Sequence, residues 1–400
     1  LGWADAHVFF PYGSAAALND LLLAHAVLTL PVAAAESPVL ALNLALLGGI
    51  VLCGVFAHLL AGELTGDPRA AAVAGVLFAL APFRFLHIGH LSVAAAWAIP
   101  LFFWALLRHL REPSWGRATL GAVSGVAVSL SSLYHAAYVA PIVPLVLLFG
   151  ARRGPGGRRT WLPLLVTGLI GLALLAWFLA PYAAALRTFG VAAAPADLLR
   201  YGADLSSLGQ KPFFLGGAGD GRNVDPEARL YPGVALAALA AVGVILAALS
   251  AWRLRGWRRS AAASFLALAG VSVLGLLLPL MGPAGAAWRL AVLGLIWVGP
   301  VVAIVWAIAS TGPGDATGAP VAIRLGAAGA LTSFVLALGP QARHLAEPIG
   351  LAPYWLLVQL SPAFQGARAP ARFGGVLVLF LALLAAGAAA ALFRRDCGRR

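Results

Sequence analysis

Apolar stretches of about 15 to 25 residues recur along almost the whole chain, and no other feature constrains the fold as strongly. They cover residues 38–62, 69–83, 91–110, 118–133, 135–150, 161–183, 230–251, 260–281, 288–309, 321–340 and 374–393. A helix of about 20 residues spans the roughly 30 Å hydrocarbon core of a bilayer. A soluble domain with 62% hydrophobic and 10% charged residues would lack the polar side chains to cover its surface. The sequence therefore predicts an all-α, polytopic transmembrane bundle of about eleven spans.

Arginine clusters in the short connections predict the orientation of this bundle. They lie in residues 108–117, 151–159, 252–259 and 394–400. Loops rich in Lys and Arg stay on the cytoplasmic side of a membrane. The net charge of +13 is therefore explained by topology, and the predicted partners include membrane lipids but no nucleic acid.

Counting crossings outward from these loops gives a single integral membrane domain over residues 1–400. It has an outer segment at 1–36, six spans in 38–183, an outer loop at 184–229, and five spans in 230–400 that include a second outer loop at 341–373. The predicted N-terminus lies outside and the C-terminus lies in the cytoplasm. A weaker apolar run, 17–34, contains Asp20, His25 and Pro31, and is predicted to form interfacial helix rather than a crossing.

The chain starts at Leu1, and we expect it to lack its natural start, with one more helix upstream. The first outer segment carries two candidate catalytic carboxylates, Asp5 and Asp20. A carboxylate can deprotonate an acceptor hydroxyl or hold a divalent metal against a phosphate. Asp20 has an equally good alternative role, because Asn19-Asp20 stands directly before an apolar run, where such residues cap helices. His25 follows in the same segment as a candidate substrate contact.

A second group of candidates lies at the outer end of the 69–83 run, in the sequence Phe83-Arg84-Phe85-Leu86-His87-Ile88-Gly89-His90. If the helix continues, Arg84, His87 and His90 share one side of it. Arginine and histidine at a membrane surface suit a lipid-linked phosphate or diphosphate. The alternative is an interfacial anchor whose arginine extends toward lipid headgroups.

Two further candidate sites lie in the outer loops. Arg368 and Arg372 precede the last span and would face one anion if helical, although Pro370 between them favours a turn. Tyr201 and Asp204 could contact a sugar, with an ordered structural loop as the alternative. Tyr134 and His135 stand at an outer turn and could join the same cavity. No metal-binding set is predicted, no cofactor is certain, and a divalent metal remains possible.

Four passages resemble bacterial membrane glycosyltransferases of the GT-C superfamily, the group that includes protein mannosyltransferases and lipid A sugar transferases. They are DAHVFFPYGSAAALNDLLLAH, ELTGDPRAAAVAGVLFALAPFRFLHIGHL, LLRYGADLSSL and SPAFQGARAPARF. The resemblance implies an extracytoplasmic active site in the bacterial inner membrane and a polyprenyl-phosphate-linked sugar donor. It also implies that the key acid lies early in the first outer loop, so that acid could precede Leu1.

The resulting hypothesis is a membrane glycosyltransferase that moves a sugar from a polyprenyl phosphate to a lipid, glycan or protein acceptor. Asp20 or Asp5 would act as the base, and the arginines and histidines would neutralise the departing phosphate. Two alternatives stand beside it. One is a transporter or flippase of lipid-linked saccharides, although charge within the apolar runs is sparse. The other is a non-catalytic protein of envelope polysaccharide assembly.

Overall fold

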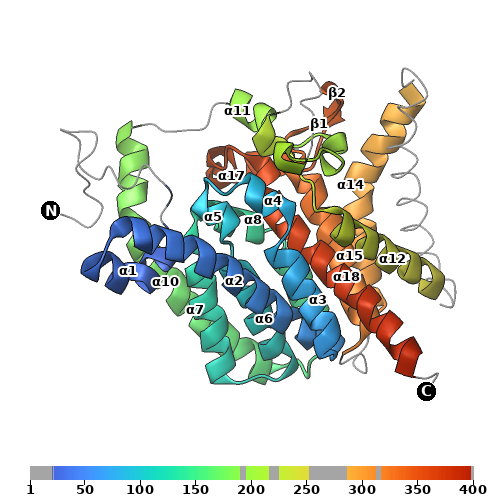
Figure 1. Cartoon of the computed structure of the whole chain (residues 1–400), viewed down its shortest axis with the longest axis horizontal. Helices are drawn as coiled ribbons and strands as arrows, with labels where there is room; N and C mark the ends of the chain where they lie inside the picture. The colour runs from blue at the N-terminus through green and yellow to red at the C-terminus, as the bar shows by residue number, and fades with distance from the viewer. Residues whose placement is uncertain are drawn as a thin grey trace.

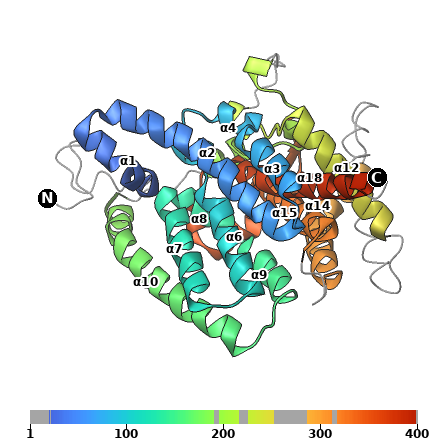
Figure 2. The same ribbon diagram turned by 60° about the horizontal axis from the view of Figure 1, so that its bottom comes forward.

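The computed structural model describes residues 20, 22–189, 195–215, 225–251, 286–311 and 317–397, and this part of the chain is mostly helical (Figures 1 and 2). Its α-helices are α1 (Leu23–Ala35), α2 (Pro38–Thr65), α3 (Pro68–Ala79), α4 (Pro82–Leu86), α5 (Leu91–Ala94), α6 (Ala98–Arg111), α7 (Trp115–Ser131), α8 (Leu133–Val139), α9 (Val143–Ala151), α10 (Arg158–Phe189), α11 (Pro195–Arg200), α12 (Val234–Ala251), α14 (Ala286–Ala309), α15 (Ala319–Ala337), α16 (Tyr354–Leu360), α17 (Pro362–Gly366) and α18 (Gly374–Cys397).

Short 3₁₀ helices and one β-hairpin complete the described structure. The 3₁₀ helices are η2 (Leu205–Leu208), η3 (Phe213–Leu215), η4 (Pro226–Ala228) and η6 (Pro370–Phe373). Strands β1 (Gln341–His344) and β2 (Glu347–Leu351) pair antiparallel, with an irregularity in the register between Ala342 and Arg343. The hairpin is a small addition to an otherwise helical fold, so the predicted all-α class fits.

Within the described residues, six helical segments are long and apolar enough to cross a membrane, or seven if the bent pair α8–α9 counts as one span. The predicted number of eleven is therefore not confirmed. The run 91–110 is broken between α5 and α6, and α6 itself has only 14 residues. Helix α7 has 17 residues, and α8 and α9 meet at a bend of 48°. The predicted run 260–281 lies outside the described residues.

Local sequence explains where the first long helices begin and end. The Ser37 side chain accepts a hydrogen bond from Val39 N, and Pro38 occupies the first turn of α2. Gly66 ends α2 with a φ of 66°, a left-handed conformation that glycine adopts without strain. Asp67 then caps α3, because its Oδ1 accepts from Arg69 N at 2.9 Å. The sequence Gly-Asp-Pro therefore turns the chain in three residues.

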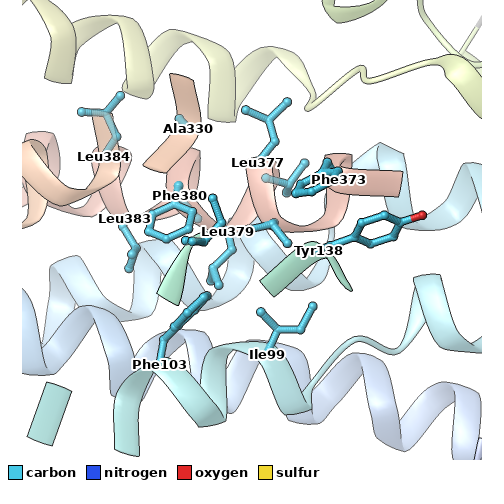
Figure 3. Close-up of a cluster of buried hydrophobic side chains, with 14 of the residues drawn as sticks. Ile99, Phe103, Tyr138, Ala330, Phe373, Leu377, Leu379, Phe380, Leu383 and Leu384 are labelled. Carbon is cyan, nitrogen blue, oxygen red and sulfur yellow. The ribbon is translucent and has the colours of Figure 1, made fainter. Parts of the chain in front are cut away.

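Helix α18 runs through the centre of the bundle and packs most extensively on α15 (Figure 3). The two backbones approach closely because glycine replaces larger side chains at the contact. A Cβ atom on Gly326 would lie 2.6 Å from Leu384 N, and one on Gly329 would lie 2.2 Å from the Phe380 ring. Small residues provide this kind of contact between membrane helices, where water offers no hydrophobic driving force.

The connections of the bundle fall into two groups. At one end, which we call the basic end, Gly318 N donates to Leu64 O at 2.8 Å and Arg111 pairs with Glu63 at 2.8 Å. At the other, the cavity end, Ala203 N donates to Ala337 O at 2.8 Å. In Figure 1 the short elements α4, α5, α8, α11 and α17 and the β-hairpin gather at the cavity end. Short elements from distant parts of the sequence therefore lie together at this end.

The glycine contact predicts a stability difference between two otherwise similar substitutions. Gly326→Ala should lower the free energy of unfolding by about 1–3 kcal/mol, because the new methyl group would push α18 away from α15. Gly294→Ala on α14 is the control, since its Cβ would meet nothing within 4 Å. Thermal melting of both variants in detergent tests this. Equal melting temperatures would contradict the close contact.

Candidate functional site

Asp20 lies at the cavity end and contacts a residue 112 positions away in the sequence. The Ser132 hydroxyl donates to Asp20 Oδ2 at 2.8 Å. Ser132 also caps α8, where its Oγ accepts from Tyr134 N at 3.2 Å. Helix α1 starts at Leu23 with Leu22 at its cap position and no side-chain cap. Asp20 is therefore not the cap of α1, and its carboxylate faces the turn between α7 and α8 instead.

Asp5, the other predicted carboxylate, lies outside the described residues.

A small cavity lies beside Ser132, with room for about one water molecule. It is lined by Ser92, Val93, Ala96, Ile99, Ser132, Tyr134, His135, Tyr138, Arg372, Gly375 and Val376. His135 is hydrogen-bonded to the Ser92 backbone, and its Nδ1 is buried with no hydrogen-bond partner among the described residues. Tyr134 and His135, which the sequence placed together as candidates for one cavity, both line this one.

Arg372 forms one wall of the cavity and is held by a buried ion pair. Its Nε donates to Glu227 Oε1 at 2.7 Å, and its Nη2 donates to the same oxygen. The guanidinium lies 5.1 Å from the centre of the Tyr134 ring. A buried charge needs such a partner, because neither ion is solvated by water there. Glu227 therefore fixes the guanidinium next to Tyr134.

Tyr134 is the side chain around which the charges of this end converge. It lies within electrostatic range of Asp20, Arg368, Arg372 and Glu227. Its ring stacks on Tyr138 with a centroid distance of 6.1 Å. Tyr138 in turn donates to Ala369 O at 2.7 Å, which anchors the segment before α18. Two carboxylates and two arginines from separate parts of the chain thus influence the same phenol.

Arg368 and Arg200 both lie over the ring of Tyr201, each 5.2 Å from its centre. Arg200 is paired with Asp225 through Nε at 3.3 Å. The exposed guanidinium of Arg368 has no ion pair or hydrogen bond among the described residues. The two arginines of the 365–373 segment therefore have separate partners, Tyr201 for Arg368 and Glu227 for Arg372. Pro370 starts a 3₁₀ turn between them, as its position favoured.

Arg84, His87 and His90 do not share a helix side, because α4 ends at Leu86. Arg84 is 1% exposed and its Nε donates to Phe78 O at 2.7 Å, while Nη1 donates to Ala94 O at 2.9 Å. These contacts join the ends of α3 and α5. The geometry therefore favours a structural role for Arg84 over the predicted phosphate contact. His90 is exposed at the start of α5.

His87 and His25, two of the buried histidines at this end, are neutral near neutral pH. His87 Nδ1 lies 2.9 Å from Phe83 O, and burial lowers the pKa of this imidazole despite that hydrogen bond. His25 Nε2 lies 3.0 Å from Ala95 O, and burial is again the main cause of its lowered pKa. His25 thereby ties α1 to the break before α6. Neither therefore supplies the positive charge that the sequence had predicted His87 to offer to a phosphate.

Asp204 serves the local fold, as the alternative reading of its loop predicted. Its carboxylate accepts from Ser206 N at 2.8 Å, Leu345 N at 3.1 Å and Ala346 N at 3.0 Å. Leu345 and Ala346 form the two-residue turn of the β-hairpin with φ values of 52° and 69°. Neither is a glycine, so this turn is strained and depends on Asp204. A sugar contact through Asp204 is disfavoured.

Three residues of this arrangement were not chosen from the sequence as site residues. Ser132, Tyr138 and Glu227 had no signal beyond their polarity, because their partners are distant in the chain. A glutamate in an outer loop opposite an arginine before the last span was the one available hint. Within the described part of the chain, no three His, Cys, Asp or Glu side chains cluster closely enough to hold a metal ion.

Fold and site together define a helical membrane protein with a charged, aromatic cavity at one end of its bundle. Residues 5–280 match the model of a family described as a domain of unknown function, DUF6311. The match covers more than half of the chain, and the chain therefore belongs to this family. No curated protein and no solved structure matches it significantly. Asp20, Ser132, His135 and Glu227 lie within the matched region, and Arg368 and Arg372 lie beyond it.

The role of Asp204 can be tested by pairing it with the strained turn. Asp204→Ala should destabilise the protein by about 1–3 kcal/mol, because three part-buried N–H groups would lose their acceptor. Ala346→Gly should stabilise it by about 1 kcal/mol, since glycine adopts positive φ freely, and should partly rescue Asp204→Ala. Thermal melting and limited proteolysis within residues 341–351 are the measurements.

Asp197→Ala provides the control, because it removes a carboxylate from the neighbouring helix α11. A hairpin equally resistant to protease in Asp204→Ala and Asp197→Ala would contradict the structural role.

Proposed function

We propose that this protein is a membrane glycosyltransferase that moves a sugar from a polyprenyl phosphate to an acceptor hydroxyl at the cavity end. The observation that carries the proposal is that Asp20 accepts from Ser132, which itself accepts from Tyr134 N, while Arg372 lies over the Tyr134 ring and Arg368 lies over the Tyr201 ring. Together with the four sequence passages that resemble GT-C enzymes, this arrangement supports a lipid-phosphate donor. The family itself assigns no activity.

The reaction requires two kinds of group, and the cavity end offers both. The bond between the sugar anomeric carbon and the phosphate oxygen breaks, and a bond to the acceptor oxygen forms. A base takes the acceptor proton, and in our proposal this is Asp20, held by Ser132. Cations stabilise the negative charge that remains on the polyprenyl phosphate. No step in this proposal requires a metal.

The two arginines divide the phosphate-binding role because their surroundings differ. Arg368 is exposed and stacks on Tyr201, so its donors are available to a phosphate. Arg372 is already bound to Glu227 and contributes by shaping the cavity beside Tyr134. In this assignment Arg368 takes the phosphate-binding role that the sequence predicted for Arg84, His87 and His90.

We place the cavity end on the extracytoplasmic side of the bacterial inner membrane. The opposite end carries Arg108, Arg111 and Arg117 together with Arg152 and Arg153. An excess of arginine in short loops favours the cytoplasmic side. In this orientation α1 lies on the outer side, which agrees with the proposed interfacial first loop.

The test is sugar transfer by the protein in liposomes that contain radiolabelled polyprenyl-phosphate sugars. Asp20→Asn should reduce turnover at least about 100-fold, because the base is lost. Arg368→Gln should reduce kcat/KM by about 10- to 100-fold, the value of a charged hydrogen bond. Arg200→Gln is the matched control and should stay within about twofold, since Arg200 stacks on the same ring but is paired with Asp225.

Two outcomes would count against the proposed activity, and a third would count against the role of Arg368. Absence of transfer from every donor, with movement of labelled lipid between leaflets, would favour a transporter of lipid-linked saccharides. Absence of both activities would favour a non-catalytic role in envelope polysaccharide assembly. Equal losses in Arg368→Gln and Arg200→Gln would remove Arg368 from the phosphate site.

A further inference from the structure

A groove runs along helix α10 near the basic end, away from the cavity. It is lined by Arg158, Trp161, Leu162, Leu164, Leu165, Gly168, Leu169 and Leu172, and its volume is about 580 Å³. This lies within the roughly 300–1,000 Å³ typical of ligand sites. Helix α10 lies at the edge of the bundle and packs on α7 (Figure 2). The groove thus opens on the surface that would face lipid.

The floor of the groove is formed where α10 has a glycine without a neighbour. A Cβ atom on Gly168 would meet nothing within 4 Å, whereas one on Gly171 would contact Val126 and Ala122 of α7. Gly171 therefore serves helix packing, whereas Gly168, one turn earlier, leaves a notch that no neighbouring helix fills. Trp161 is 42% and Leu165 is 60% exposed beside this notch. The notch is apolar and suits an alkyl chain.

Positive charge is concentrated at the mouth of the groove. Arg158 and Arg159 start α10, Arg152 precedes it, and all three side chains are exposed. None of the three has an ion pair among the described residues. The first turn of a helix already carries partial positive charge, so cations placed there are unfavourable unless an anion joins them. The mouth is therefore suited to an anionic group.

We propose that an anionic phospholipid occupies this groove, with its headgroup phosphate at Arg158 and Arg159 and one acyl chain beside Gly168. The arginines at the mouth suit the headgroup phosphate, and the apolar notch suits the acyl chain that follows it in the lipid. A second copy of the chain is a poorer occupant, because a parallel neighbour would bring its own arginines to the same place. The site does not depend on sugar transfer at the cavity end.

Native mass spectrometry of the detergent-purified protein tests this, with phosphatidylglycerol or phosphatidylcholine added. The unchanged protein should retain phosphatidylglycerol at about tenfold higher occupancy. The double variant Arg158→Gln/Arg159→Gln should retain both lipids equally, because the charge preference is lost. Gly168→Leu should retain less of either, because its side chain fills the notch. Gly294→Leu on α14 is the control, where a Cβ also meets nothing, and should bind like the unchanged protein.

Three results would overturn the proposal, provided that melting temperatures show the variants to be folded. The first is equal retention of the two lipids by the unchanged protein. The second is binding that Gly168→Leu reduces no more than Gly294→Leu does. The third is a dimer mass that disappears in Gly168→Leu, which would make a second copy the occupant.

Discussion

The cavity end depends on one buried guanidinium. A helix that breaks inside a membrane bundle leaves carbonyl groups without partners, and water cannot satisfy them there. Arg84 solves this problem twice, because it donates to Phe78 O at the end of α3 and to Ala94 O at the end of α5. Its guanidinium group also lies over the Phe78 ring, with Cζ 3.9 Å from the ring centre. The short helices that carry the cavity can exist because this side chain holds the breaks together.

The arginines of this end differ in the groups that already bind their guanidinium side chains. Arg84 is surrounded by carbonyl oxygens, Arg372 by the Glu227 carboxylate, and Arg200 by Asp225. Arg368 alone among these four has only an aromatic face as a partner in the described structure. Sequence position gives no hint of this ranking, yet it decides which arginine can bind a phosphate. The proposed mechanism therefore depends on partners more than on the number of positive charges.

The sequence predicted the elements of this protein better than its contacts. Apolar length placed most of the helices, because a span must match the thickness of the bilayer. The predicted eleven spans are not confirmed, because a run such as 91–110 is interrupted, here at Ala95–Trp97 between α5 and α6. The site was only partly predictable. Asp20 and Arg372 stood out as charges near apolar runs, but their partners Ser132 and Glu227 are fixed by tertiary packing.

The order of these contacts along the chain has a consequence for biosynthesis. Membrane helices enter the bilayer in sequence as the ribosome delivers them, and N-terminal parts fold first. Asp20 emerges before Ser132, and Arg372 follows much later, directly before α18. The hydrogen-bond acceptor of Tyr138, Ala369 O, is likewise made much later than Tyr138 itself. A nascent chain that ends before Arg372 thus carries the carboxylate without the complete cavity, and the site forms only after the segment before α18 has been made.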